Sequence, residues 1–276
     1  MSSYLSLVSD PLQFGRGHLT RQLQVQLEFE KLGIKHSIYL NTSESASLIL
    51  KGETTLLLDL SVLDSEPSKD FLKQFTEIVG FDWSGEFVPD RNFVVVSHPD
   101  KTYQASKDVS IGLQNLIIRQ EISTLSESLT EIKLEHLLIS LGYSSEKKAY
   151  LKALSLAKDL PEMPVIIASG RELDISSSED LRIVVDSHNF IELLSSAKAV
   201  ISNGGTTYIE SLLLGKSVLP IPQTDDEEYF VDTISSITSP DLTLPGFWRL
   251  DDQKASKAGV GFYGAERICR IIKEGL

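Results

Sequence analysis

The sequence predicts an α/β protein built from two doubly wound, Rossmann-like lobes. Three observations lead to this expectation. Short apolar runs alternate with amphipathic segments along the whole chain, which is the pattern of strands separated by helices. Several runs, such as TLLLD, FVVVS and RIVVD, are apolar on both faces, as in parallel strands covered by helices. The length of 276 residues suits two domains of roughly 130–150 residues each.

The first half of the chain alternates in this way from its start. The expected strands are Tyr4–Val8, His36–Leu40, Thr55–Leu60, Glu77–Phe81 and Phe93–Ser97. The expected helices are His18–Leu32 and Ser68–Phe75. Apolar residues recur at helical spacing in the first helix, and Gly33 follows it, where glycine commonly ends a helix.

The second half repeats the alternation. The expected strands are Leu137–Leu141, Pro164–Ser169, Leu181–Val185, Ala199–Ser202 and Ser217–Ile221. The expected helices are Lys147–Leu160, Phe190–Ser196, Thr206–Leu214 and Gly264–Glu274. The polar stretch Ser123–Lys133 fits neither pattern, so we expect the lobes to be residues 1–132 and 133–276. The last helix can pack on either lobe.

The balance of charges limits the classes of partner. The formal net charge is −13, whereas non-specific binding to nucleic acid or anionic membranes needs an excess of Lys and Arg. Cys269 is the only cysteine, so an intrachain disulfide is excluded and a reducing compartment fits. The N-terminal segment has no basic start, and no run reaches the ~18 apolar residues of a membrane span. We therefore expect a cytoplasmic protein without a membrane span or a nucleic-acid partner.

The turn after the first expected strand has the composition of a ligand-binding loop. Gly15 and Gly17 flank Arg16 and precede His18, which opens a helix. Glycines let a ligand approach the backbone, and free N–H groups at a helix start favour anionic or polar oxygens. A histidine there can act as a general base near neutral pH. The alternative is a tight turn with a solvated His18. Because Thr20 stands where the third glycine would be, the turn is not a dinucleotide-binding fingerprint.

A second loop follows the expected strand Ala199–Ser202. It consists of small and polar residues that end the strand and open a helix: Asn203, Gly204, Gly205, Thr206 and Thr207. Glu210 falls one turn into that helix, where the helix dipole favours a carboxylate that can accept both hydroxyls of a ribose. The next strand leads to Gln223 and an acidic run. The alternative is a plain strand–helix–strand unit in which Glu210 and the acidic run are solvated.

These residues resemble a known family. The spacing Gly204-Gly205-Thr206-Thr207-x-x-Glu210, with Gly215 and Pro222-Gln223 after it, resembles the nucleotide-binding lobe of GT-B glycosyltransferases. Within that superfamily the chain resembles the UDP-sugar hydrolases of pseudaminic acid biosynthesis and the related spore-coat polysaccharide proteins (PseG/SpsG-like). The passages that carry this likeness, in order along nearly the whole chain, are FGRGHLTR, LLLDLSVLD, GLQNLIIRQEI, HLLISLGYSS and YGAERI.

The resemblance implies a GT-B architecture with the substrate between the lobes, so that His18 and Glu210 face each other across one gap. The C-terminal lobe would bind UDP, with Glu210 on the ribose. The residues expected at the diphosphate are Gly142, Tyr143, Ser144, Gly204, Gly205 and Thr206. In the N-terminal lobe, His18 would activate water for attack on the anomeric carbon, and Arg21 would hold His18 or a sugar substituent. The strand end at Asp59 belongs to the same substrate-binding set. No metal or redox cofactor is implied.

The chain departs from the family in places that are expected to touch the sugar. The family's aromatic residue is missing from the stretch 112–119, and its Asp-Asp pair is replaced by Asp82-Trp83. Three functions therefore stay open: hydrolysis of a UDP-linked acetamido sugar, glycosyl transfer from the same donor, and non-catalytic binding as a partner of pathway enzymes. His98, at the end of a strand, is the second candidate for a functional histidine. No pair of histidines has the spacing of metal ligands.

Overall fold

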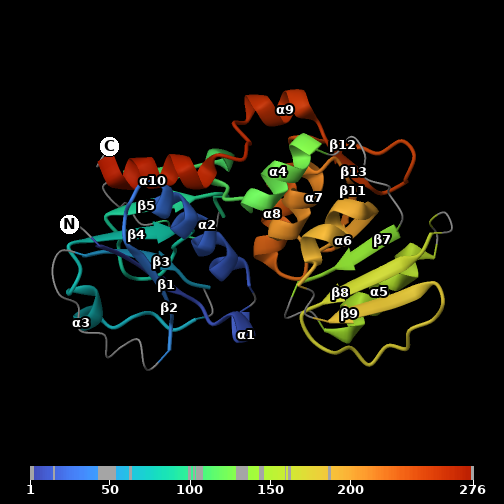
Figure 1. The fold of residues 1–276 in the computed structure, drawn as a ribbon, viewed down its shortest axis with the longest axis horizontal. Helices are drawn as coiled ribbons and strands as arrows, with labels where there is room; N and C mark the ends of the chain where they lie inside the picture. The colour runs from blue at the N-terminus through green and yellow to red at the C-terminus, as the bar shows by residue number, and fades with distance from the viewer. Residues whose placement is uncertain are drawn as a thin grey trace. The chain divides into compact units, whose positions relative to one another are not determined.

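The computed structural model describes residues 3–14, 16–42, 54–61, 64–98, 101, 103, 108–128, 136–142, 146–158, 160, 163–185 and 188–274. Contacts divide the chain into two compact units. The first contains the residues up to Arg119 together with those from Gly259 onward, and the second runs from Gln120 to Ala258. Each unit contains a sheet with helices packed on it (Figure 1).

The first unit has a parallel sheet in the order β2-β1-β3-β4-β5-β6. Its strands are β1 (Ser3–Val8), β2 (His36–Leu40), β3 (Thr54–Asp59), β4 (Glu77–Phe81), β5 (Arg91–Val94) and β6 (Asp108–Ile111). Its helices are α1 (Pro11–Phe14), α2 (Gly17–Lys31), α3 (Lys69–Leu72), the 3-10 turn η2 (Leu113–Asn115) and α10 (Gly264–Glu274).

Both faces of this sheet are covered by apolar side chains. Leu56 and Leu58 of β3 belong to one buried cluster with Phe71 of α3. Leu57, between them, belongs to another cluster with Phe29 of α2. Because side chains alternate between the faces of a strand, the two clusters lie on opposite faces. This is the arrangement expected for a doubly wound sheet.

The last helix of the chain packs in the first unit, which the sequence left undecided. α10 lies alongside α2 (Figure 1), and the thiol of Cys269 contacts the carbonyl oxygen of Val25 at 3.7 Å. Arg91 of β5 donates to the carbonyl oxygen of Ile271 at 2.9 Å. The chain therefore returns to its first sheet after completing the second unit.

The second unit has a mixed sheet in the order β12-β13-β11-β10-β7-β8-β9, in which β13 is antiparallel to both of its neighbours. Its strands are β7 (His136–Ser140), β8 (Val165–Ser169), β9 (Leu181–Val185), β10 (Ala197–Ser202), β11 (Ser217–Pro220), β12 (Thr238–Pro240) and β13 (Trp248–Leu250). Its helices are α4 (Gln120–Ser128), α5 (Lys147–Ala157), α6 (Phe190–Ser196), α7 (Thr206–Leu213), α8 (Asp225–Ser235) and α9 (Asp252–Lys257).

The structure differs from the sequence-based expectation at the start of this unit. The expected boundary after residue 132 lay within a polar stretch, but residues 120–128 form α4, which contacts α6 and α7. The division between Arg119 and Gln120 follows, because α4 packs with the second unit. The acidic run after Gln223 is also a helix start: in α8, the Thr224 side chain caps the helix by accepting from the N–H of Glu227, and carboxylates in a first turn are favoured by the helix dipole.

Candidate functional site

The strand order of each sheet contains a switch point, where loops leave neighbouring strands in opposite directions. In the first unit this point lies between β1 and β3, and in the second between β7 and β10. Ligands of doubly wound sheets bind at the carboxyl ends of the strands beside such a point. The loop after β1 leads to His18, and Asp59 ends β3. After β7 and β10 the chain continues into Gly142 and Asn203 respectively.

In the first unit, His18 and Asp59 form a hydrogen-bonded pair. His18 lies in the first turn of α2, and its Nδ1 is 2.7 Å from Oδ1 of Asp59. The carboxylate has no exposed surface, whereas 24% of the His18 side chain is exposed. The sequence analysis places Asp59 in the substrate-binding set, and in this structure its buried carboxylate accepts from His18, Arg21 and Gln22. An arrangement in which a buried carboxylate holds Nδ1 leaves Nε2 as the ring nitrogen that this carboxylate does not bind.

Arg21 binds the same carboxylate one turn further along α2. Its Nε donates to Oδ2 of Asp59 at 2.8 Å, and its terminal nitrogens donate to Asp59 and Asp82. Burial alone would raise the pKa of Asp59, but the Arg21 guanidinium and the hydrogen bond to His18 hold it well below its usual range. Burial alone would lower the pKa of Arg21, but the two carboxylates raise it. Asp59 is therefore ionised at neutral pH.

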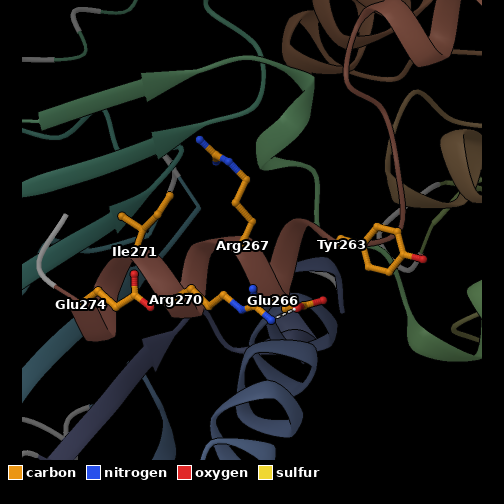
Figure 2. Close-up of a pocket in the computed structure, with 6 residues that line it drawn as sticks. All are labelled: Tyr263, Glu266, Arg267, Arg270, Ile271 and Glu274. Atoms are coloured by element: carbon orange, nitrogen blue, oxygen red, sulfur yellow. Dashed lines mark ion pairs between the residues drawn. The ribbon is translucent and has the colours of Figure 1, made fainter.

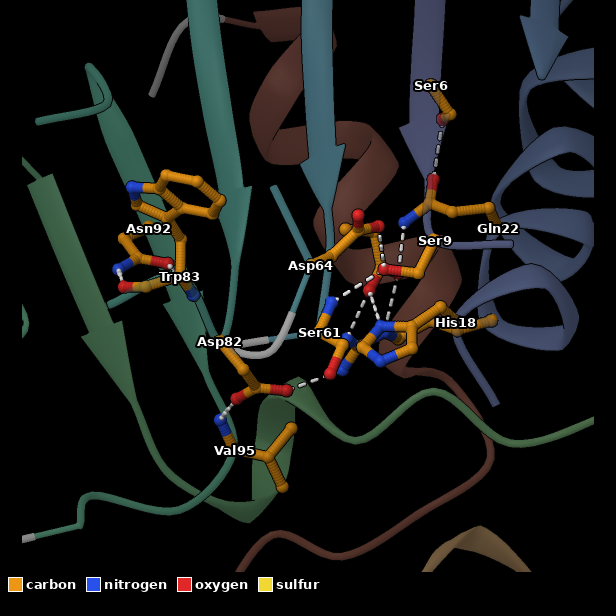
Figure 3. A network of polar contacts seen from close by, with 12 residues as sticks. Ser6, Ser9, His18, Gln22, Ser61, Asp64, Asp82, Trp83, Asn92 and Val95 are labelled. Atoms are coloured by element: carbon orange, nitrogen blue, oxygen red, sulfur yellow. Dashed lines mark hydrogen bonds and ion pairs between the residues drawn. The ribbon is translucent and has the colours of Figure 1, made fainter. Parts of the chain in front are cut away.

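Asp82 completes this group with a strained backbone. Among the described residues other than glycine, it is the one with a positive φ, of 51°. β5 holds the turn in place: the N–H of Asp82 donates to the carbonyl oxygen of Phe93 at 2.9 Å, and Oδ1 accepts from the N–H of Val95 at 2.7 Å (Figure 3). Strained residues persist where the surrounding structure fixes them, often at functional sites. The result is a carboxylate, 34% exposed, that faces Arg21. We call His18, Arg21, Gln22, Asp59 and Asp82 the His18 cluster.

The other predicted residues of the first unit are placed differently. Gly17 is the exposed first residue of α2, and Gly15 lies outside the described residues. His98 lies in the loop after β5, where its N–H is 3.3 Å from the hydroxyl oxygen of Tyr103. Of the predicted set, His18, Arg21 and Asp59 come together here.

In the second unit the loop Asn203–Gly205, here called the Asn203 loop, is held by Glu227 of α8. The side-chain nitrogen of Asn203 donates to one oxygen of the Glu227 carboxylate, and the N–H of Gln223 donates to the other at 2.6 Å. Burial raises the pKa of Glu227, and the hydrogen bonds to it act in the opposite direction. A Cβ at Gly204 would stand 2.4 Å from the carbonyl oxygen of Glu227, so only glycine fits.

The start of α7 presents backbone donors beside this loop. Gly205 is the N-cap and has no side chain to accept from the first N–H groups, and both Thr206 and Thr207 are partly exposed. Gly142 has a positive φ of 85°, and a Cβ on it would be 3.2 Å from the Asn203 side chain, so the loops after β7 and β10 meet. Tyr143 and Ser144, predicted to continue the loop after β7, lie outside the described residues.

Glu210 and Gln223 differ in accessibility. Glu210, which the sequence analysis expects to accept the hydroxyls of a ribose, has no exposed surface in this structure. Gln223 is exposed, and its side-chain nitrogen donates to the carbonyl oxygen of Ile221 at 2.6 Å. In the second unit, the partly exposed residues at the start of α7 are therefore more accessible to a ligand than the Glu210 carboxylate.

A pocket of about 430 Å³ lies elsewhere in the first unit, along α10 (Figure 2). Its lining residues are Tyr263, Glu266, Arg267, Arg270, Ile271 and Glu274. Arg270 pairs with Glu266, and Arg267 donates to the side-chain oxygen of Asn115 at 2.8 Å. The pocket shares no residue with the His18 cluster. We place the candidate site at the cluster, because it contains a histidine paired with a buried carboxylate, whereas the residues that line the pocket include no histidine.

Sequence reasoning missed two residues that the structure adds to these sites, and it named a third, Asp82, only where the chain departs from the family pattern. Asp82 directly follows β4 at the carboxyl edge of the sheet. Gln22 stands four residues after His18, on the same helical face. Glu227 was recognised only as one member of an acidic run, with solvation as the alternative, although Thr224 three residues before it is a helix-capping signal. Among the described residues, no group of three His, Cys, Asp or Glu side chains is arranged to hold a metal ion.

Comparisons with known proteins identify the fold. No family model and no curated protein matches the sequence. Among solved structures, UDP-N-acetylglucosamine 2-epimerase from Rickettsia bellii is similar with a TM-score of 0.55 at 15% identity, over 99% of this chain and 96% of that chain. The Methanocaldococcus jannaschii UDP-GlcNAc 2-epimerase in complex with UDP-GlcNAc and UDP is similar with a TM-score of 0.54 at 10% identity, over 99% and 100%.

An α-glucosyltransferase in complex with UDP is similar to the same degree, with a TM-score of 0.54 at 11% identity over 99% of this chain and 98% of that chain. At these identities the likeness concerns the fold. The expected fold class is thereby confirmed: the chain consists of two Rossmann-like α/β units of the GT-B type. None of the helices in the described part of the chain is both long and apolar enough to cross a membrane.

Proposed function

We propose that the protein hydrolyses a UDP-linked sugar with His18 as the general base. The observation that carries this proposal is the hydrogen bond between His18 Nδ1 and the buried, ionised carboxylate of Asp59. An ionised carboxylate can only accept, so Nδ1 keeps the hydrogen and the lone pair of the neutral ring lies on Nε2. The ring is partly exposed at the carboxyl end of β1, where water can reach that lone pair.

In the proposed reaction, Nε2 takes a proton from water as the water oxygen bonds to the anomeric carbon. The bond from that carbon to the phosphate oxygen breaks, and its electron pair stays on UDP. The anomeric configuration inverts, and His18 later releases the proton to solvent. In this assignment Asp59 orients His18 and does not touch the sugar. Asp82, the partly exposed carboxylate of the cluster, is the proposed partner for a hydroxyl or amide hydrogen of the sugar.

The proposed nucleotide site is the start of α7. Backbone N–H groups at a helix start bind anions, and the helix dipole favours negative charge there. We assign the diphosphate to the N–H groups of Gly205, Thr206 and Thr207, with Gly142 beside them. The fold likeness to an epimerase in complex with UDP-GlcNAc and UDP, and to an α-glucosyltransferase in complex with UDP, supports a UDP-linked ligand. Because Glu210 is buried, we assign it no contact with the ribose.

The first test measures UDP release from UDP-linked acetamido sugars without an added acceptor. We expect turnover by the native protein and a loss of about 10²- to 10⁴-fold in kcat for His18→Ala, the range typical of a general base. His188→Ala, at an exposed histidine of the second unit, is the matched control and should leave kcat unchanged. Unchanged turnover in His18→Ala would overturn the assignment.

A glycosyltransferase with the same donor is the second candidate, favoured by the fold likeness to an α-glucosyltransferase. It predicts release of UDP only when an acceptor is supplied. A non-catalytic binding protein would bind UDP in calorimetry but turn over no donor, with or without an acceptor. In each case UDP should bind at least about tenfold more tightly than UMP, because the second phosphate adds charge-assisted hydrogen bonds at the start of α7. Equal affinities for UDP and UMP would remove the diphosphate assignment.

A further inference from the structure

A line of buried hydrogen bonds leads from β2 to the His18 cluster. His36 Nε2 is 2.7 Å from Oγ of Ser6, and that hydroxyl donates to Oε1 of Gln22 at 2.7 Å. Gln22 Nε2 then donates to Oδ2 of Asp59 at 2.8 Å. Ser6, Gln22 and Asp59 have no exposed surface, and Figure 3 shows Gln22 between Ser6 and His18. The line therefore reaches the base through atoms closed to solvent.

The direction of donation along this line is fixed. A serine hydroxyl has one hydrogen, and Ser6 gives it to Gln22, so the oxygen of Ser6 must accept from His36 Nε2–H. Oε1 of Gln22 receives the Ser6 hydrogen, which leaves the amide nitrogen toward Asp59. A flipped amide would place two acceptor oxygens against each other. Each donor in the series therefore points toward Asp59, whose other oxygen accepts from His18.

We propose that Gln22 is a positioning residue for His18, acting through Asp59. This inference rests on the proposed role of His18 as the base. Oδ2 of Asp59 accepts from Gln22 and from Arg21 Nε, while Oδ1 accepts from His18 and from a terminal nitrogen of Arg21. Without Gln22, most of the remaining hydrogen bonds to the Asp59 carboxylate come from Arg21, so the carboxylate can rotate toward the guanidinium. The hydrogen bond that holds the hydrogen on Nδ1 of His18 then weakens, and the ring samples the tautomer with the hydrogen on Nε2, which cannot accept a proton from water.

A merely structural role for Gln22 makes a different prediction. A buried amide that only fills space and satisfies Ser6 would affect stability when removed, but it would leave the tautomer of His18 unchanged. The location of the hydrogen on the His18 ring is visible in the ¹⁵N shifts of the two ring nitrogens. This measurement needs no substrate, so it is independent of the reaction that the protein catalyses.

The experiment compares Gln22→Met with Gln26→Met. Gln26 stands on the same helix, and its side chain donates to the backbone oxygen of His36, outside the line to Asp59. In ligand-free protein at a pH where His18 is neutral, we expect the native protein and Gln26→Met to carry the hydrogen on Nδ1. Gln22→Met should shift the ring toward the Nε2–H tautomer. It should also lower kcat for the UDP-linked sugar by about 10- to 100-fold, with little change in KM, as for other residues that orient a functional group.

Ser6→Ala is the second variant, in case Gln22→Met does not fold. It removes the hydrogen bond to Oε1 and leaves the amide of Gln22 in place, so a smaller shift in the same direction is expected. An unchanged Nδ1–H tautomer in both variants overturns the inference, whatever the activity. A tautomer shift in a protein that turns over no UDP-linked sugar supports the positioning role and instead contradicts the proposed function. A tautomer shift together with lower kcat supports both.

Discussion

The loops at the two switch points hold equivalent places in their sheets, yet they are built from different groups. After β1 and β3 the first unit presents charged side chains that bind one another: His18, Arg21, Asp59 and Asp82. After β7 and β10 the second unit presents glycines and backbone N–H groups, and its nearby carboxylate, Glu227, faces inward to hold the loop. The first arrangement fixes charge and hydrogens at chosen atoms, whereas the second leaves donors open to an anion.

This difference matters for what each unit can do. A base needs a defined tautomer and a fixed charge behind it, which only a side-chain network supplies. A diphosphate needs several donors and close approach, which backbone N–H groups beside glycines supply. The stability of the first unit should therefore be sensitive to the loss of a charge or a change of pH. The stability of the second unit should be sensitive to added side-chain atoms beside its glycines. Three predictions test this contrast, and fluorescence can follow each unit, because Trp83 belongs to the first and Trp248 to the second.

The largest effect is expected from Arg21→Met. Asp59 is fully buried, and the substitution removes its cationic partner while leaving the carboxylate in place. Removing one member of a buried ion pair typically costs about 3–5 kcal/mol, and we expect that loss in the free energy of unfolding of the first unit. Urea unfolding of a Trp248→Phe background, followed through Trp83, measures it.

Arg270→Met is the matched control for this prediction. Arg270 pairs with Glu266 on the surface of α10, and 63% of its side chain is exposed. An exposed pair four residues apart on a helix contributes about 0.3–0.5 kcal/mol, so the control should be close to native. Equal losses in the two variants would mean that the buried network does not stabilise the first unit in the way proposed.

The sequence predicted the parts of these sites that are local in the chain. The glycine-rich turn before His18 and the Asn203 loop were visible as strand, glycine and helix in succession. The long-range contacts between the parts were not. The resemblance places Asp59 in the substrate-binding set, but its hydrogen bond to His18, 41 residues away, depends on β1 and β3 being neighbours in the sheet. The sequence also gave no sign that Glu210, one turn into its helix, would be closed to solvent.

Several elements were missed for similar physical reasons. α4 and α8 are polar helices whose apolar residues are few, so their composition resembles that of loops. α8 could have been recognised from its cap, Thr224, and its acidic first turn. β6, β12 and β13 are short strands with little apolar pattern, and their pairing depends on the neighbouring strands of the sheets.

The second prediction concerns pH and acts on the first unit through His36. Burial lowers the pKa of His36 from 6.5 to about 4 in the folded protein. Between these values the unfolded chain binds the proton and the folded chain does not, so stability falls as pH decreases from 6.5 to 4, by up to about 3 kcal/mol. Glu227 acts in the opposite direction in the second unit, because burial raises its pKa and favours proton binding by the folded state.

His36→Gln isolates this effect. The amide can still donate to Ser6, but it does not titrate, so the decline in stability of the first unit between pH 6.5 and 4 should become shallower. Urea midpoints followed through Trp83 at several pH values provide the measurement. If the slopes of the native protein and His36→Gln are the same, the acid sensitivity of the first unit arises from groups other than His36.

The smallest loss of stability is expected in the second unit, where the close packing around Gly204 leaves no room for a larger side chain. A Cβ at Gly204 would stand 2.4 Å from the carbonyl oxygen of Glu227, a backbone atom in the first turn of α8 that cannot move without shifting the helix. Overpacking of this kind costs about 1–3 kcal/mol, so Gly204→Ala should destabilise the second unit by that amount when Trp248 is followed in a Trp83→Phe background.

Gly205→Ala is the matched control at the next position. There the added Cβ would be 3.3 Å from the side-chain nitrogen of Asn203, which can turn aside, so a loss of less than about 1 kcal/mol is expected. The same pair of variants sharpens the contrast between the units. Neither variant changes a charge, so neither should alter the pH dependence of stability, whereas substitution of Asp59 or of its cationic partner Arg21 should. If Gly205→Ala lowers the free energy of unfolding as much as Gly204→Ala does, then the Asn203 side chain is fixed as rigidly as the backbone. The Asn203 loop would then be held by a rigid side-chain network like that of the first unit, and the proposed difference between the units would be wrong.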